Sequence, residues 1–458
     1  MKERFELVEK AILTMVEEKK YSTLRDILVT MNPADIAGIF NSLDDKRIPL
    51  MFRLLPKELA AETFVEMESD DQELLIQGFS DNELKEVLDE LYVDDAVDII
   101  EEMPANVVRR ILTQADPEMR KSINQILRYP ENSAGAWMTT EYVSLRPIMT
   151  VEEAILRIRR QGVDKETIYT CYVTKDRKLL GIVTVKDLLL AEDDDMLISD
   201  LMVTDLISVN THTDQEEVAS MFSKYDFLAM PVVDNENRMV GIVTVDDAID
   251  VMEEEATEDI ELMGGMLPSE DTYLRSTVWE LFKNRIPWLL FLMLSATFTG
   301  MIINSFEDAL AAQMALSAFI PMLMGTGGNS GSQSSVTIIR ALSLDEVKFA
   351  DLPRVVWKEI RTAVLCGAAL AVVCFVKILL VDRMLFGNPD ITLMVDAVVC
   401  LAMFVTVLLA KTVGAVLPMV AKILKLDPAV MASPFITTIV DALSLLVYFL
   451  FATMLLGV

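Results

Sequence analysis

Histidine and paired cysteines are almost absent from this sequence of 458 residues. His212 is the single histidine. The chain therefore has almost no residues for histidine-based general-base chemistry or for histidine-rich zinc sites. The four cysteines, Cys171, Cys366, Cys374 and Cys400, form no CxxC pair, and the last three lie in apolar stretches. We therefore expect no disulfide framework, and a reducing compartment suits the soluble part of the chain.

Positive charge is also scarce, with 40 Lys and Arg against 71 Asp and Glu and a net charge of −31. A chain of this charge repels phosphate backbones, so nucleic-acid binding is not expected. The N-terminus, MKERFELVEK, lacks an apolar core of signal-peptide length. We therefore expect no export of the segment that follows it.

The acidic excess belongs to one part of the chain only. Residues 1–272 hold 27 Lys and Arg against 59 Asp and Glu, a net charge of −32. Residues 273–458 hold 13 against 12, a net charge of +1. With 52% hydrophobic residues overall, the sequence indicates an acidic soluble part fused to a nearly neutral membrane part.

The first 130 residues contain a short repeat. After Met31 the chain divides into blocks of twelve residues that end at Leu127, such as SDNELKEVLDEL and YVDDAVDIIEEM. Most blocks open with residues typical of a helix N-terminus and close on an apolar residue. One apolar stripe per short helix cannot form a core alone, so we predict an all-α superhelical N-domain over residues 1–130. Its acidic residues fit two interpretations, a solvated surface and a cation-binding surface.

Residues 131–252 contain a longer repeat. The strings LLGIVTVKD and MVGIVTVDD stand sixty residues apart, each after a strand-like run and an amphipathic segment. They resemble a tandem of α/β cystathionine β-synthase-type (CBS) domains, over residues 131–200 and 201–252. Such modules are usually regulatory and often bind adenine nucleotides. The resemblance implies Asp187, with Thr184, as the candidate site for bound ATP; a pair that binds no nucleotide is the alternative.

Apolar stretches between 18 and 31 residues long follow, at residues 286–303, 309–339, 362–381, 391–421 and 428–458. Because a bilayer-spanning helix needs about 20 residues, we predict a five-helix α transmembrane domain over residues 276–458. Basic residues gather after the second stretch and between the last two: Arg340, Lys348, Arg354, Lys358, Arg361, Lys422 and Lys425. This distribution predicts a cytoplasmic N-terminal half and a C-terminus outside. Five spans rarely enclose a pathway, so we expect a homodimer.

Two features of these stretches indicate an ion pathway. The string GTGGNSGSQSS, residues 325–335, suits a tight helix crossing or the wall of a wet cavity. Its polar residues Asn329, Ser332 and Gln333 favour the cavity wall. Asp441 stands near the middle of the last stretch, where a carboxylate marks an ion pathway by default. A purely structural partner for Asp441 is the alternative.

Lys411 is a further charged residue at membrane depth. It precedes Lys422 by 11 residues, which places it about 16 Å from that helix end. By the same rise, Asp441 lies about 20 Å beyond Pro428. The similar depths allow a Lys411–Asp441 ion pair, although snorkelling or contact with a neighbouring helix is the favoured interpretation.

The order of these parts resembles the MgtE family of magnesium transporters over essentially the full chain. Four motifs carry the resemblance: YPENSAGAWMTTEYV, TVDDAIDVMEEEATEDI, GTGGNSGSQSS and LDPAVMASPFITTIVDA. The resemblance implies a long connecting helix on the membrane over residues 253–275 and a dimeric pore. It also implies Mg²⁺ uptake across the cell membrane, with cytosolic Mg²⁺ closing the pore.

The resemblance implies a metal site in this pore, formed by Asp441 of each protomer with Asn329. Mg²⁺ dehydrates reluctantly and is usually held with its waters by one or two carboxylates, which suits this set. Ser332, Ser433 and Ser444 depart from residues common in the family. We therefore expect the water-mediated contacts of the ion to differ here.

The resemblance also implies sensor sites, in which cytosolic Mg²⁺ bridges carboxylates of the N-domain, the CBS pair and the connecting helix. The matching residues are Asp94, Asp95, Asp98, Asp214, Glu216, Asp226, Asp247, Asp250, Glu255, Glu258, Asp259 and Asp427. Glu255, Glu258 and Asp259 fall at i, i+3 and i+4, so one helix face presents three carboxylates. For any single residue of the set, a solvated surface is the alternative.

Other classes of function fit less well. A CBS-regulated transporter of another divalent cation, Mn²⁺ or Co²⁺, is the alternative to a Mg²⁺ channel. An anion carrier should show basic residues within its spans, where only Lys377 and Lys411 occur. A membrane enzyme lacks any Ser-His, Cys-His or HExxH constellation, so we expect no enzymatic activity.

Overall fold

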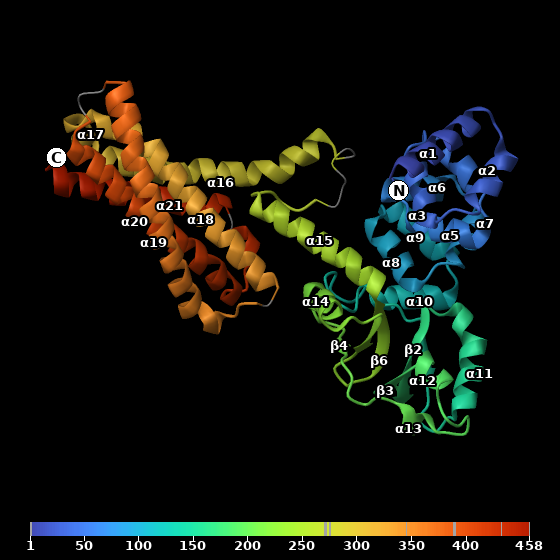
Figure 1. The fold of residues 1–458 in the computed structure, drawn as a ribbon. Helices are drawn as coiled ribbons and strands as arrows, with labels where there is room; N and C mark the ends of the chain where they lie inside the picture. Colours follow the sequence, from blue (N-terminus) through green and yellow to red (C-terminus); the bar gives the residue numbers. More distant parts are fainter. Residues whose placement is uncertain are drawn as a thin grey trace. The chain divides into compact units, whose positions relative to one another are not determined.

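The computed structural model describes residues 2–269, 273, 276–344, 346–387, 391–431 and 433–457. The chain divides into two compact units, Met1–Met252 and Glu253–Val458 (Figure 1). The division falls within helix α15 (Val245–Met263), so this helix begins in the first unit and ends in the second.

The first unit opens with short helices joined by tight turns. They are α1 (Lys2–Glu17), α2 (Tyr21–Leu28), α3 (Pro33–Phe40), α4 (Ile48–Phe52), α5 (Lys57–Val65), α6 (Ser69–Gly78), α7 (Asp81–Leu88), α8 (Val93–Glu102), α9 (Ala105–Gln114) and α10 (Pro117–Ile126). Polar caps begin several of them, such as the capping box of Ser80 and Glu83 on α7. Helices two apart pack together, α3 on α5 on α7 on α9 and α4 on α6 on α8 on α10. This pattern is the superhelix that the twelve-residue repeat predicts.

Two three-stranded sheets of equal topology follow. The first contains β1 (Tyr142–Leu145), β2 (Thr167–Lys175) and β3 (Lys178–Thr184), and the second contains β4 (Val209–Asn210), β5 (Ala229–Val233) and β6 (Met239–Thr244). In each sheet the first two strands are parallel and the last two antiparallel. The helices of this region are α11 (Val151–Gln161), α12 (Val185–Leu189), α13 (Ile198–Leu201) and α14 (Gln215–Tyr225), with a 3₁₀ turn at Gly162–Asp164.

The repeated glycine of each sheet has a steric cause. A Cβ at Gly181 would lie 2.7 Å from the carbonyl oxygen of Val203, and one at Gly241 would lie 2.5 Å from that of Thr139. In both sheets a neighbouring segment bridges the last strand at this point, Val203 to Ile182 and Thr139 to Ile242. Only glycine leaves room for these close backbone approaches.

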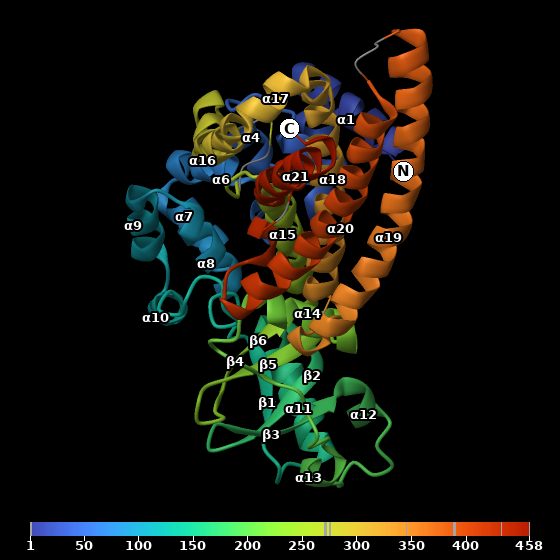
Figure 2. The same cartoon turned by 90° about the vertical axis from the view of Figure 1, so that its left-hand side faces the viewer.

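The second unit is helical. Its described helices are α16 (Val278–Ser305), α17 (Glu307–Ala312), α18 (Ile320–Ser343), α19 (Leu352–Lys377), α20 (Leu393–Ile423) and α21 (Ser433–Leu456). Shorter helical segments are η2 (Met314–Phe319), η3 (Phe349–Asp351), the π-helical stretch Ile378–Leu385 and η5 (Pro428–Met431). α18, α20 and α21 pack against one another, and α19 packs on α20 (Figure 2).

In the described part of the chain, four helical stretches are long and apolar enough to cross a membrane: Val278–Ser305, Phe349–Leu385, Leu393–Ile423 and Pro428–Leu456. The expected span of residues 309–339 instead divides into α17, η2 and α18. α18 has 24 residues, about 36 Å of helix, but its Gly, Ser, Asn and Gln lower its hydropathy. Five spans therefore stay a prediction, one that depends on α18.

Candidate metal sites

Buried carboxylates of the first unit meet where α8 and the start of α15 come together. Asp94, Asp95 and Asp98 lie on α8, and Asp246 and Asp247 lie in the first turn of α15. Burial, followed by repulsion from neighbouring carboxylates, raises the pKa of Asp98 to about 8. Burial raises the pKa of Asp247 to about 7, although a hydrogen bond from Thr244 opposes the shift. Burial, followed by repulsion from Asp247, also raises the pKa of Asp94 well above its usual range. The sequence-predicted Asp94, Asp95, Asp98 and Asp247 thus share one electrostatic neighbourhood.

Glu141 and Glu166 join this cluster, and the sequence analysis missed both. Burial, followed by repulsion from Asp95, Asp246 and Asp247, raises the pKa of Glu166 to about 8. β1 and β2 pair Tyr142 with Thr167, which places the two glutamates that precede these residues side by side. Glu141 belongs to the motif YPENSAGAWMTTEYV, which is the one sequence signal that could have found it.

Two oxygens of this cluster are buried without a hydrogen bond. They are Oδ1 of Asp94 and Oε2 of Glu166, and neither has a partner in the described structure. A buried carboxylate oxygen without a donor is costly unless a cation or a proton neutralises it. We name Asp94, Asp95, Asp98, Glu141, Glu166, Asp246 and Asp247 the α8–α15 acid cluster.

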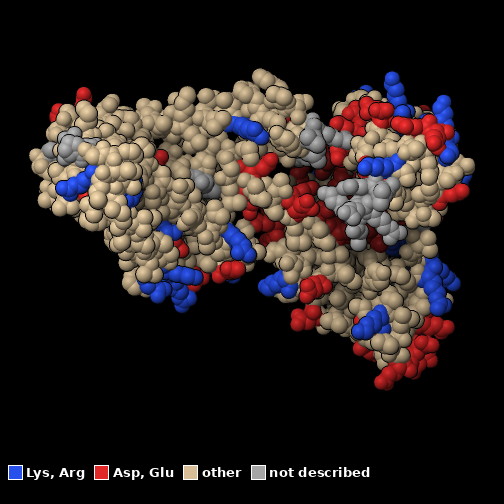
Figure 3. Space-filling view, turned by 45° about the horizontal axis from the view of Figure 1, so that its top comes forward, with Lys and Arg blue, Asp and Glu red and all other residues tan. Residues whose placement is uncertain are grey.

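Two further carboxylate pairs lie in the same unit. Burial, followed by repulsion from the sequence-predicted Asp250, raises the pKa of Glu66. Burial and repulsion from Glu131 likewise raise the pKa of Glu101. Acidic side chains are abundant on the visible face of this unit, whereas the visible face of the second unit is mostly uncharged, with basic groups at several places along it (Figure 3).

The three predicted sensor residues around α14 have local structural roles. Asp214 is the N-cap of α14 and accepts a hydrogen bond from the backbone N–H of Glu216 at 3.0 Å. Asp226 ends the same helix in a left-handed conformation with φ of 55°. Their role in binding cations stays a prediction.

A second acidic group forms within the second unit. Glu255, Glu258 and Asp259 lie on α15, and Asp427 lies in the loop before η5. Burial raises the pKa of Glu258 and Asp259, and Glu255 and Asp427 raise both further. The hydroxyl of Ser343, at the end of α18, donates to Asp259 Oδ2 at 3.5 Å. We name Glu255, Glu258, Asp259 and Asp427 the connecting-helix acid group.

These acidic residues do not form a closed cage. Among the described residues, no three His, Cys, Asp or Glu side chains are already arranged as ligands of one ion. A hydrated Mg²⁺ keeps several of its waters and needs only one or two direct carboxylates. The arrangement therefore suits a hydrated ion that draws separate carboxylates together.

In the second unit, α18 turns Gly327, Gly328 and Gly331 towards α20 and α21. A Cβ at Gly327 would lie 2.7 Å from Thr406 Cγ2 and 2.8 Å from Ser444 Oγ. A Cβ at Gly331 would lie 2.8 Å from Ile436 Cγ2, and one at Gly414 would collide with the carbonyl oxygen of Gly331. The tight-crossing interpretation of the glycine-rich string is therefore correct for this face.

The predicted pore residues flank the same crossing. Asp441 lies half-buried on α21, and a Cβ at Gly328 would lie 3.8 Å from its Oδ1. The carboxylate thus faces α18 where that helix has no side chain. Asn329 and Gln333 are exposed on the other face of α18. Lys411 is buried on α20 and donates to Ser334 Oγ at 3.4 Å, which is contact with a neighbouring helix.

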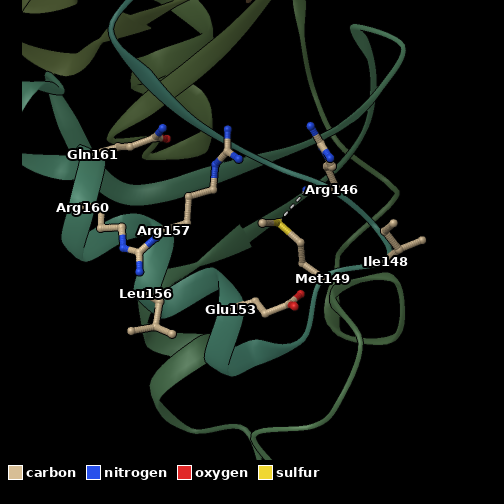
Figure 4. Close-up of a pocket in the computed structure, with 8 residues that line it drawn as sticks. All are labelled: Arg146, Ile148, Met149, Glu153, Leu156, Arg157, Arg160 and Gln161. Atoms are coloured by element: carbon tan, nitrogen blue, oxygen red, sulfur yellow. Dashed lines mark hydrogen bonds between the residues drawn. The ribbon is translucent and has the colours of Figure 1, made fainter.

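The nucleotide candidates form a helix cap. Thr184 and Asp187 make the capping box of α12, in which the Asp187 N–H donates to Thr184 Oγ1 at 3.1 Å. A separate cavity of about 570 Å³ lies in the same domain, and neither residue lines it. Arg157 and Arg160 border it from α11, and Arg146 and Ile148 border it from the preceding loop (Figure 4).

The raised pKa values predict that the first unit loses stability as pH rises in the absence of metal. Each carboxyl binds its proton more tightly when folded, so the linked stability is present below the unfolded pKa near 4 and is lost as pH rises through about 6 to 8. In EDTA, the melting temperature of the first transition of the full chain should therefore fall between pH 5.5 and 8.5. Mg²⁺ should raise it at least twice as much at pH 8 as at pH 6.

Asp98→Asn should flatten this pH dependence. The matched control is Asp44→Asn, because the side chain of Asp44 is 78% exposed. Equal pH profiles of the melting temperature for the parent and Asp98→Asn would contradict an electrostatic origin of the loss of stability.

Comparison with known proteins covers each part of the chain. The family model described as "Divalent cation transporter" matches residues 320–451, the MgtE intracellular N domain matches 31–132, and the CBS domain matches 134–194 and 198–254. The magnesium transporter MgtE of Thermus thermophilus is 36% identical over 412 residues, which cover 89% of each chain. The magnesium transporter MgtE of Bacillus subtilis is 33% identical and covers 89% of this chain and 88% of its own.

Solved structures match the first unit. A cytosolic domain of the Mg²⁺ channel MgtE in complex with ATP is 36% identical with a TM-score of 0.51, covering 53% of this chain and 99% of its own. The soluble part of a magnesium transporter is 32% identical with the same TM-score and covers 55% of this chain and 99% of its own. This chain belongs to the MgtE family of magnesium transporters.

Proposed function

We propose that this protein is a Mg²⁺ channel of the cell membrane that mediates magnesium uptake and is closed by cytosolic Mg²⁺. The observation that carries the proposal is the Asp441 carboxylate, held in an apolar helix against the glycine face of α18. A carboxylate at membrane depth is costly and is retained where it serves an ion. Membership of a family of named magnesium transporters supports the same function.

The pore requires a second copy of the chain. Asn329 and Gln333 form an exposed polar stripe on α18, which is unfavourable against lipid. In a homodimer with five spans per protomer, the two stripes face each other and two Asp441 carboxylates share one hydrated ion. The distribution of basic residues in the loops supports a topology with the first unit in the cytoplasm and the C-terminus outside.

Asp441→Asn should abolish Mg²⁺ uptake by proteoliposomes, because Asn keeps the size of the side chain but removes the charge that holds the ion. The loss should exceed a hundredfold, while the melting temperature and the oligomeric state in detergent stay unchanged. Asp396→Asn is the matched control, since Asp396 is a buried carboxylate on α20. Normal uptake by a folded Asp441→Asn protein would disprove the pore assignment.

Selectivity among divalent cations separates this proposal from its alternative, a transporter of Mn²⁺ or Co²⁺. Two carboxylates with an amide oxygen suit the hard, strongly hydrated Mg²⁺, whereas imidazole or thiolate ligands would favour transition metals. Uptake measured with Mg²⁺, Mn²⁺ and Co²⁺ in turn decides between the two.

We propose that the α8–α15 acid cluster and the connecting-helix acid group sense cytosolic Mg²⁺. At an effective dielectric near 20, two like charges 4 Å apart repel by about 4 kcal/mol. Without Mg²⁺ this repulsion loosens α15, and bound Mg²⁺ removes it. Asp214, Glu216, Asp226 and Asp250 would contribute to the same set. Because many weak sites act together, the response should be steep and its affinity low.

Millimolar Mg²⁺ should protect the segment from Glu253 to Met266 against limited proteolysis and inhibit flux over the same concentration range. Joint substitution of Asp247, Asp250, Glu255, Glu258 and Asp259 by Asn or Gln should remove the metal dependence, because the neutral segment packs without an ion. Cleavage at one rate with and without Mg²⁺ would rule out the sensor. A joint variant that keeps the parent's inhibition curve would place the sensor elsewhere.

ATP binding at the first CBS domain is a second function that we propose. The solved cytosolic domain in complex with ATP supports it, at 36% identity to this chain. Thr170 of β2 pairs with Thr184, and Tyr169, which is 67% exposed, precedes Thr170 in the same strand. The Asp187 carboxylate offers an acceptor for ribose hydroxyls, and an exposed ring of this domain offers stacking for adenine.

Asp187→Ala should weaken ATP binding at least tenfold in calorimetric titration of the full chain. The control is Glu153→Ala, because Glu153 has the same capping role on α11. Equal affinities for both variants and the parent would exclude Asp187 from the nucleotide site.

A further inference from the structure

One chain of hydrogen bonds connects three helices of the second unit, and it runs through Lys411, Ser334 and Glu359. Lys411 of α20 is 6% exposed and its Nζ lies 3.4 Å from Ser334 Oγ of α18. Ser334 is 2% exposed and its hydroxyl lies 2.6 Å from Oε2 of Glu359 on α19. No part of the proposed pore or sensor includes these residues.

The donor and acceptor roles in this chain have one consistent assignment. A hydroxyl has a single proton, and a carboxylate only accepts, so Ser334 donates to Glu359. Its lone pairs then accept from the ammonium group of Lys411, which only donates. A buried ammonium group requires a counter-charge, and Glu359 supplies it one hydroxyl away. The set is therefore neutral as a whole, and the two bonds strengthen each other through the polarised hydroxyl of Ser334.

The chain of bonds lies beside a close crossing of α18 and α20. Ser334 follows Gly331 by one turn on α18, and Lys411 precedes Gly414 by one turn on α20. Gly331 and Gly414 are the residues at which the two backbones touch. The bonds thus fix the rotation of α18 at the crossing, and with it the direction of Asn329 on the opposite face.

We propose that Lys411 and Glu359 are positioning residues for Mg²⁺ permeation, which hold α18 through Ser334 so that its exposed polar stripe meets the ion. Through the same bonds Glu359 neutralises the charge of Lys411, so Lys411 does not neutralise Asp441. This inference rests on the proposed function, because it assumes that α18 borders the ion pathway.

The test measures Mg²⁺ uptake by proteoliposomes as a function of external Mg²⁺ for the full chain. Lys411→Met and Glu359→Gln each leave one charge without its partner, so α18 shifts and the half-saturating Mg²⁺ concentration should rise at least fivefold. Glu359→Gln should have the larger effect, because it leaves the more deeply buried charge uncompensated. The double variant Lys411→Met/Glu359→Gln should return to within twofold of the parent, since no unpaired charge is left.

The matched control is Lys377→Met, because Lys377 of α19 pairs with Asp382 at 2.8 Å, outside this chain of bonds. It should leave the half-saturating concentration unchanged. A merely structural role would lower the melting temperature of the single variants while folded protein kept the parent's half-saturation, and that result would overturn the proposal. A double variant that does not fold, or that is shifted as far as the worse single variant, would also overturn it.

Failure of this inference is distinguishable from failure of the pore assignment. If Asp441→Asn is inactive while all variants of Lys411 and Glu359 match the parent, the positioning role alone is wrong. If the Asp441→Asn protein transports Mg²⁺ normally, the pore assignment is wrong, and the positioning role is then wrong as well.

Discussion

Repulsion among buried carboxylates is the constraint on which the proposed regulation of this protein depends. In the α8–α15 acid cluster, burial, followed by repulsion from neighbouring carboxylates, raises the pKa values of Asp98 and Glu166 to about 8. Buried carboxylates of this kind are costly unless protons or cations neutralise them. Because divalent cations carry two charges and hold their waters, Mg²⁺ is well suited to neutralise this cluster. Lys411 is the reverse case, because its counter-charge is supplied within the protein.

The sequence predicted the helical repeat, the duplicated sheet and the apolar helices, since each follows from a local period or a repeated string. The resemblance to the MgtE family, rather than a local pattern, placed Asp94, Asp98 and Asp247 in one set. Glu166 was missed, because the pairing of Tyr142 with Thr167 places Glu166 next to Glu141, and no local pattern encodes that register. Non-local contacts of this kind arise only when strands distant in sequence pair.

Glu359 illustrates the same limit in the membrane part. The uncharged run begins at residue 362, so the sequence predicts that Glu359 belongs to a basic cytoplasmic loop. The helix in fact begins at Leu352, and Glu359 reaches Ser334 from within it. Ser334 is equally inconspicuous within a string of glycines and serines. The glycine string has one face that packs against α20 and α21 and one face that is polar and exposed, so the tight-crossing interpretation describes the first face and the cavity-wall interpretation stays a prediction for the second.

The end of α15 packs against α18 and against η5, the segment that precedes α21. Leu262 and Met263 pack with Ile339 of α18 and Ala429 of η5, while Asp259 accepts from Ser343 at the end of α18. α15 thus touches the helix that carries the polar stripe and the segment that leads into the helix of Asp441. Repulsion between Asp259 and Asp427 acts across this contact. In the proposed mechanism, a cation bound there favours the packed arrangement, and its loss would release α18 and η5 together, because the end of α15 contacts both of them.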